Sequence, residues 1–141
     1  MKEMLSVVPI ALFFLVGVIS SVMAFKSLSS KKFLPFHEKA ASKSWSELED
    51  PFKFVVLSLL RLGGLGFLVI SILLIVCPIL NYYFPNIFYE YLIPLIALIY
   101  CTGLFLINFS LSKSAKANTP WKESIYAMVI LLVGIFISIL N

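Results

Sequence analysis

Arg61 is the residue of this sequence best placed to do chemistry, because it lies inside a long apolar segment. That segment covers 54–80, and Arg61 and the glycine-rich stretch Gly63–Gly66 interrupt it. An ionisable side chain in a membrane span is energetically costly, so it usually faces the bundle interior and finds a partner there. A guanidinium in that position is suited to bind an anionic group such as a lipid phosphate.

Two other polar residues are expected at the same depth as Arg61. Counting outward from the flanking turns brings Arg61 level with Asn108 in the third apolar segment and with Glu123 at the start of the fourth. These three side chains are predicted to converge within about one helical turn of depth, with His37 and Trp45 near the mouth of the pocket. The alternative is that Arg61 marks the membrane boundary and extends to the head groups.

Small residues in two of the apolar segments predict helix packing. Gly63, Gly64 and Gly66 do not form a dinucleotide-binding loop, because the third glycine of that fingerprint is missing and no strand precedes them. They favour the close approach of another helix instead. Gly17 and Ser21, four residues apart in the first segment, offer a similar smooth face.

The remaining motif search is negative. His37 is the single histidine and adjoins Glu38, but adjacent residues on a helix point in different directions. One histidine is also too few to build a histidine-based metal site. We find no zinc-protease, paired-cysteine, phosphate-loop or serine-elbow pattern. No cofactor or metal is therefore expected, and an enzymatic role is disfavoured.

The composition defines the class of protein that must position these residues. Hydrophobic residues make up 61% of the chain and charged residues 13%, against roughly 45–50% and about 25% in soluble domains. Four apolar segments are each near the roughly 20 residues that span a bilayer. They cover about 5–25, 54–80, 87–111 and 121–140. The sequence therefore predicts a single membrane domain over 1–141, an all-α integral membrane protein with a four-transmembrane-helix bundle.

The polar region 26–53 predicts one more element. Within it, His37, Ala41, Trp45 and Leu48 fall on one helical face. This pattern favours a short amphipathic interfacial helix after the first span, with Trp45 at the level of the head groups. An irregular charged loop is the alternative.

Prolines and capping residues predict where helices begin and end. Asp50 followed by Pro51 is typical of a capped helix start, and Thr119-Pro120 repeats the pattern before the fourth segment. Pro78 is predicted to mark the end of the second segment.

The distribution of lysines predicts the orientation in the membrane. Loops 26–53 and 112–120 are rich in lysine, whereas loop 81–86 has none. By the positive-inside rule both lysine-bearing loops are cytoplasmic, and both termini lie on the outer side of what we expect to be a bacterial inner membrane. The first segment is expected to stay as an anchor, because lysines follow it directly, rather than to be cleaved as a signal peptide.

Two functions remain in competition after these exclusions. The leading hypothesis is a non-enzymatic accessory or scaffold subunit, which packs through its glycine faces and basic loops against a membrane-protein partner or a second copy. The alternative is a lipid-handling protein, binder or enzyme, that uses the cluster around Arg61. A carrier or channel ranks third, because the spans offer few polar residues. Membrane lipids are expected partners and nucleic acid is not, since the net charge of +4 flanks membrane spans.

Overall fold

The structure, a computed structural model, describes the backbone of residues 2–140 and the side chains of residues 7–140, and contains no strand within this range. Four helices are long and apolar enough to cross a membrane. They are α1 (Lys2–Ser29), α3 (Asp50–Tyr83), α4 (Ile93–Ala115) and α5 (Trp121–Leu140). The predicted class is confirmed: the chain is an all-α, multi-pass membrane protein built as a four-helix bundle.

Three short elements complete the fold, namely α2 (Pro35–Ala41), the 3-10 turn η1 (Trp45–Glu47) and the π-helical turn η2 (Phe88–Leu92). The short helix expected after the first span is therefore present as α2. It does not extend to Trp45, because Ser42 adopts a left-handed conformation with φ of 51°. A left-handed residue of this kind ends an α-helix.

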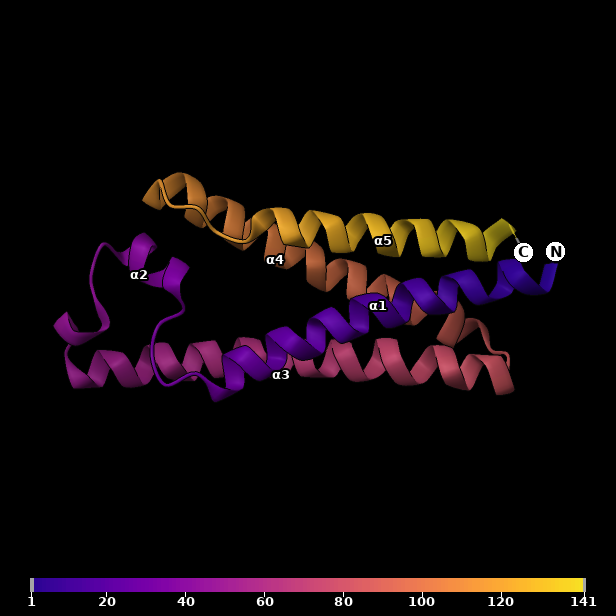
Figure 1. Cartoon of the computed structure of the whole chain (residues 1–141), viewed down its shortest axis with the longest axis horizontal. Helices are drawn as coiled ribbons and strands as arrows, with labels where there is room; N and C mark the ends of the chain where they lie inside the picture. The colour runs from indigo at the N-terminus through magenta and orange to yellow at the C-terminus, as the bar shows by residue number, and fades with distance from the viewer. Residues whose placement is uncertain (1, 141) are drawn as a thin grey trace.

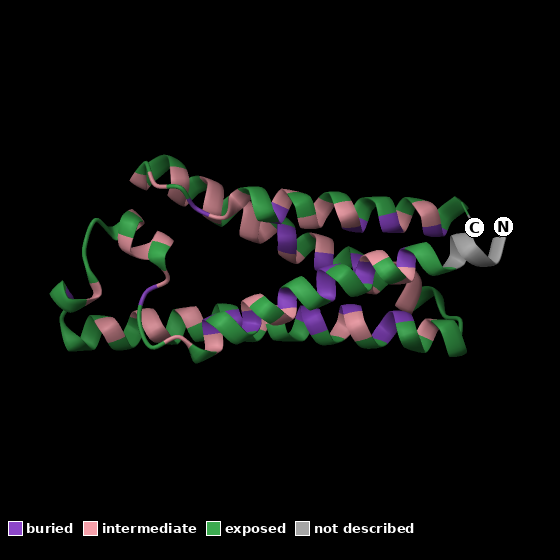
Figure 2. Cartoon of the chain, in the orientation of Figure 1, coloured by how far each residue is buried: buried purple, intermediate pink, exposed green. Residues whose placement is uncertain are grey.

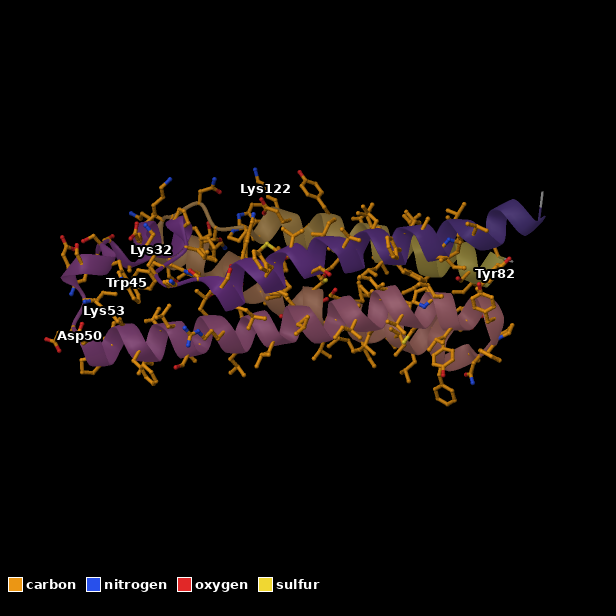
Figure 3. The ribbon with its side chains drawn as sticks, turned by 60° about the horizontal axis from the view of Figure 1, so that its bottom comes forward. Lys32, Trp45, Asp50, Lys53, Tyr82 and Lys122 are labelled. Atoms are coloured by element: carbon orange, nitrogen blue, oxygen red, sulfur yellow. The ribbon has the colours of Figure 1, made fainter. Side chains whose placement is uncertain are left out.

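The long helices are arranged as two pairs that converge at one end. α1 crosses α3, and α4 runs alongside α5, as Figure 1 shows. α1 also packs against α5, whereas α3 and α4 have few contacts with each other. Both described chain ends lie at the converging end, which also carries Tyr82 (Figure 3). We call this the tyrosine-bearing end, and the opposite end, with α2 and loops 30–49 and 116–120, the lysine-bearing end.

The core lies where the two pairs converge. Figure 2 shows the buried positions gathered in the middle of the bundle and toward the tyrosine-bearing end. The central cluster takes residues from all four long helices: Phe13, Val16, Ile70, Leu74, Ala97, Cys101 and Leu131. The lysine-bearing end is less tightly packed, and this difference creates the space described below.

Small residues bring α1 and α3 together. A side chain added at Gly17 would place its Cβ 2.8 Å from Ile75 Cγ1, so the two helices approach closely there. One turn further, the hydroxyls of Ser21 and Ser71 are hydrogen-bonded to each other. Gly64 accommodates the last turn of α1 in the same way. Association of membrane helices relies on such close packing and on hydrogen bonds between helices.

The prediction that Pro78 ends the second helix is wrong. α3 continues through Pro78, which is buried, and ends at Tyr83. Proline cannot donate a backbone hydrogen bond to the residue four positions earlier. Membrane helices tolerate this loss because neighbouring helices and local adjustments satisfy the freed groups.

The two predicted helix caps are also different from expectation. Asp50 is the first residue of α3 and makes no capping bond, but its carboxylate accepts a hydrogen bond of 3.0 Å from Lys53 Nζ. Thr119 does not cap α5. Its hydroxyl instead donates to the backbone carbonyl of Asn108 at 2.6 Å, which ties the end of α4 to the start of α5.

Candidate functional site

Helix lengths place several residues at one level along the bundle. Arg61 precedes Tyr83 by a stretch of α3 that is about 33 Å long, and Asn108 follows Phe88 by about 30 Å. Trp121 begins the 20-residue helix α5, which is also about 30 Å long. The hydrocarbon core of a bilayer is about 30 Å thick. Arg61, Asn108 and Trp121 therefore lie near one membrane boundary when the tyrosine-bearing end lies at the other.

A cleft of about 340 Å³ opens near this boundary, between α3 and α4. Its volume is within the range of roughly 300–1,000 Å³ that is usual for small-molecule sites. The lining residues are Val56, Leu59, Leu60, Gly63 and Phe67 of α3; Leu104, Ile107 and Asn108 of α4; and Met23, Ser27, Phe33, Leu34, Phe36, His37 and Pro120. Most of this surface is apolar, so the cleft is suited to hydrocarbon.

The sequence of α3 explains one wall of the cleft. Its lining residues are Val56, Gly63 and Phe67 with the adjacent pair Leu59 and Leu60, and this spacing puts them on one face of the helix. Gly63 lies in the middle of that face, and nothing lies within 4 Å of the position that a Cβ would occupy. A side chain at this position would occupy the cleft. Because Gly63 has no side chain, the cleft is deeper at this position.

Helix α2 closes the cleft from the lysine-bearing end. It contacts α4 and contributes His37, whose ring centroid is 4.0 Å from that of Phe36 and 5.9 Å from that of Phe33. His37 Nδ1 is buried and has no hydrogen-bond partner among the described residues. Burial lowers the pKa of His37 from its ordinary value of 6.5, so the ring is neutral at pH 7.

Asn108 is held in place by the connection between α4 and α5. The side-chain Nδ2 of Asn108 donates to the backbone carbonyl of Leu104 at 3.0 Å. The backbone carbonyl of Asn108 accepts the hydrogen bond from the hydroxyl of Thr119, a residue that is only 4% exposed. An amide side chain offers two donor hydrogens and one acceptor oxygen. One hydrogen and the oxygen therefore remain for a molecule in the cleft.

The structure does not bring Arg61 and Glu123 to Asn108. Both side chains are exposed, neither lines the cleft, and no hydrogen bond or ion pair joins the three among residues 7–140. Arg61 lies one helical turn before Gly64, which packs against the last turn of α1. Binding of a lipid phosphate by Arg61 stays a prediction.

Trp45 does not line the cleft but packs against Phe33, which does. Its ring meets Phe33 edge-on, with centroids 5.2 Å apart. Its backbone N–H donates to Glu38 Oε1 at 3.3 Å, and a capping box between Ser44 and Glu47 fixes the turn that carries it. These contacts couple η1 to α2.

The predicted packing residues have different surroundings. Gly17, Ser21 and Gly64 lie in the contact between α1 and α3, as described above. Gly66 faces the ring of Tyr100 on α4, whose hydroxyl donates to the carbonyl of Gly63 at 3.2 Å.

Sequence reasoning missed Phe33, Phe36 and Thr119 as parts of the site. The two phenylalanines were visible as aromatic residues in an otherwise polar region, next to the single histidine. The sequence predicts Thr119 as a helix cap. Its bond to Asn108 could not be predicted, because that bond depends on the angle between two helices.

A second cavity of about 260 Å³ lies at the tyrosine-bearing end. All four long helices or their connections contribute to it, and Glu90 is its charged residue. Within the described residues, no three His, Cys, Asp or Glu side chains are close enough to hold a metal ion. The α3–α4 cleft remains the larger of these two cavities and the one that contains residues singled out by the sequence.

Acidification is expected to detach α2 from the cleft. The pKa of His37 is lowered in the folded protein, where α2 is docked on the cleft. This docked state is therefore fully stable above pH 6.5 and loses stability as the pH falls below that value. We would follow Trp45 fluorescence in a Trp121→Phe background between about pH 7.5 and about pH 5.5. The pH-dependent change in Trp45 fluorescence should disappear in His37→Phe. If the same fluorescence change persists in that variant, another titrating group is responsible.

Comparisons with protein-family models, with curated proteins and with solved structures find no match to this chain. The fold and the cleft therefore define its class: a small multi-pass helical membrane protein with an apolar cleft near one membrane boundary.

Proposed function

We propose that this protein binds a membrane lipid in the cleft between α3 and α4. The observation that carries the proposal is the shape of the cleft, which is apolar and has an exposed rim on each helix. Leu59 of α3 is 62% exposed and Ile107 of α4 is 67% exposed, although both line the cleft. A hydrocarbon chain can pass between these two side chains from the surrounding bilayer.

Selection of the lipid must come mainly from its head group. Lipid tails are as apolar as leucine, so a chain gains little hydrophobic free energy by moving from the bilayer into the cleft. The polar lining residues that a head group could contact are Ser27, His37 and Asn108.

We further propose that the lysine-bearing end faces the cytoplasm of a bacterial cell, with both termini outside. All basic residues of the chain except Lys2 belong to this end or its approach, and Figure 3 shows Lys32, Lys53 and Lys122 there, opposite Tyr82. Anionic lipids of the cytoplasmic leaflet attract such residues. The cleft then takes its lipid from the cytoplasmic leaflet.

The accessory-subunit hypothesis has less support from the structure. Gly17, Ser21 and Gly64 are already used in the contact between α1 and α3, and Gly66 is covered by Tyr100. Of the predicted packing residues, Gly63 keeps an open face, and that face lines the cleft.

Filling the cleft is expected to remove the bound lipid. Gly63→Leu places a side chain in the cleft, whereas Gly103→Leu is a matched control, since both glycines have nothing within 4 Å of an added Cβ and Gly103 is outside the cleft. Overpacking costs about 1–3 kcal/mol, which corresponds to about 5-fold to about 150-fold weaker binding. The measurement is mass spectrometry of the lipids that co-purify in native nanodiscs.

The wild type and Gly103→Leu should retain one enriched lipid that Gly63→Leu lacks. Bulk lipid in all three samples would contradict the proposal. A stoichiometric partner protein, retained in all three without an enriched lipid, would restore the accessory-subunit hypothesis.

A further inference from the structure

The lining of the α3–α4 cleft carries no formal charge. Its polar members are Ser27, His37 and Asn108, and no Lys, Arg, Asp or Glu is among the described residues that line it. Arg61 and Glu123, expected to supply charge here, are exposed outside it. A phosphate drawn into this cleft would lose its water without gaining a cation, which is strongly unfavourable. The cleft therefore disfavours an ionised head group.

Two lining residues have unused hydrogen-bonding capacity. Among the described residues, His37 Nδ1 is buried without a partner, and Asn108 has one free amide hydrogen after its bond to Leu104. A neutral imidazole carries one N–H, and the proton can reside on Nδ1. A buried polar atom without a partner is costly, so a molecule that supplies acceptors to these donors gains specifically from entering.

Aromatic rings also line the cleft. Phe33, Phe36 and Phe67 line the cleft together with the ring of His37. Aromatic groups prefer offset-stacked or edge-to-face contacts with other planar groups. The lining is therefore suited to a flat head group, and the tail can leave across the rim formed by Leu59 and Ile107.

Resting on the lipid-binding function proposed above, we infer that the cleft selects an uncharged lipid whose head group carries carbonyl oxygens, with His37 and Asn108 as hydrogen-bond donors. Isoprenoid quinones and diacylglycerols both present this chemistry, and the aromatic lining fits the quinone ring better. The basic residues outside the cleft hold the protein against anionic lipids of the bilayer but do not touch the selected head group.

The test uses the full chain in phosphatidylcholine nanodiscs with three soluble probes: decylubiquinone, dioctanoylglycerol and dioctanoyl phosphatidate. Binding is measured as a shift of the thermal unfolding midpoint during titration. We expect at least one of the two neutral probes to bind about tenfold more tightly than phosphatidate. His37→Phe and Asn108→Leu should each weaken that binding by about 3-fold to 10-fold, since each removes one hydrogen bond.

Two further variants separate a lost contact from a lost fold. His37→Gln keeps an N–H donor and should retain more binding than His37→Phe. Asn118→Leu changes an exposed asparagine outside the cleft and should bind like the wild type. If His37→Phe and Asn108→Leu bind the neutral probe as tightly as Asn118→Leu does, the inferred contacts are absent and the inference fails.

The probes also distinguish a quinone from a glycerol ester as the head group. They separate a failure of the uncharged head group from a failure of lipid binding itself. Preference for decylubiquinone assigns a quinone, and preference for dioctanoylglycerol assigns a glycerol ester. Tightest binding of phosphatidate would overturn the uncharged head group but leave the lipid-binding function standing. If no probe binds the wild type better than Gly63→Leu, the lipid-binding function itself is wrong.

Discussion

Gly17→Leu is expected to be among the most destabilising substitutions in this chain, lowering the free energy of unfolding by about 1–3 kcal/mol. A Cβ at this position would lie 2.8 Å from Ile75 Cγ1 and 3.2 Å from Leu74 Cβ. Leu74 is fully buried in the central cluster and cannot move without disturbing its neighbours. α1 and α3 must therefore separate, and their shared hydrogen bond between Ser21 and Ser71 is lost with them.

Reversible unfolding in mixed detergent micelles, followed by helical circular dichroism, measures this effect. Gly103→Leu is again the matched control, because it adds the same side chain to an open position. It should be neutral or slightly stabilising, since leucine favours a helix over glycine by up to about 1 kcal/mol. Equal unfolding midpoints for Gly17→Leu and Gly103→Leu would show that α1 and α3 do not pack as described.

Labelling of single cysteines is expected to give an all-or-none difference between the two ends of the bundle. Phe84→Cys at the tyrosine-bearing end should react with a membrane-impermeant maleimide in intact spheroplasts. Ser114→Cys at the lysine-bearing end should react only after the membrane is opened, because the positive-inside rule places it in the cytoplasm. Phe84 and Ser114 are both exposed.

The native cysteines provide a low background for this experiment. Cys77 and Cys101 are buried within α3 and α4, so neither should react with a polar reagent in the folded protein. The cysteine-free double serine variant is the control for residual labelling. The opposite pattern would reverse the proposed orientation and place the α3–α4 cleft in the outer leaflet, without changing the residues that line it.

The number and type of the membrane helices can be predicted from the amino-acid sequence alone. Each apolar segment is long enough to span the hydrocarbon, and a backbone in lipid must satisfy its hydrogen bonds within one helix. This local requirement does not depend on which helices are neighbours. A helix that ended at Pro78 would leave further backbone groups unsatisfied in lipid, so α3 continues to Tyr83, and neighbouring helices help to satisfy the group freed by the proline.

Counting residues predicts the depth of polar groups, but not their direction. It puts Arg61 and Asn108 near one level, yet Arg61 is on a different side of α3 from the residues that face Asn108 across the cleft. Depth depends only on helical rise. Direction depends on rotation about the helix axis and on which helix lies alongside.

The pairing of the helices, and therefore the position of the cleft, becomes visible in the folded structure. α3 packs against α1 rather than against α4, the next span in sequence, and this choice leaves the cleft between α3 and α4 for α2 to close. In water, a hydrophobic stripe would have indicated the buried face of each helix. In a bilayer the lipid is as apolar as a neighbouring helix, so pairing depends on small residues and close packing between distant segments, which no local pattern in the sequence reveals.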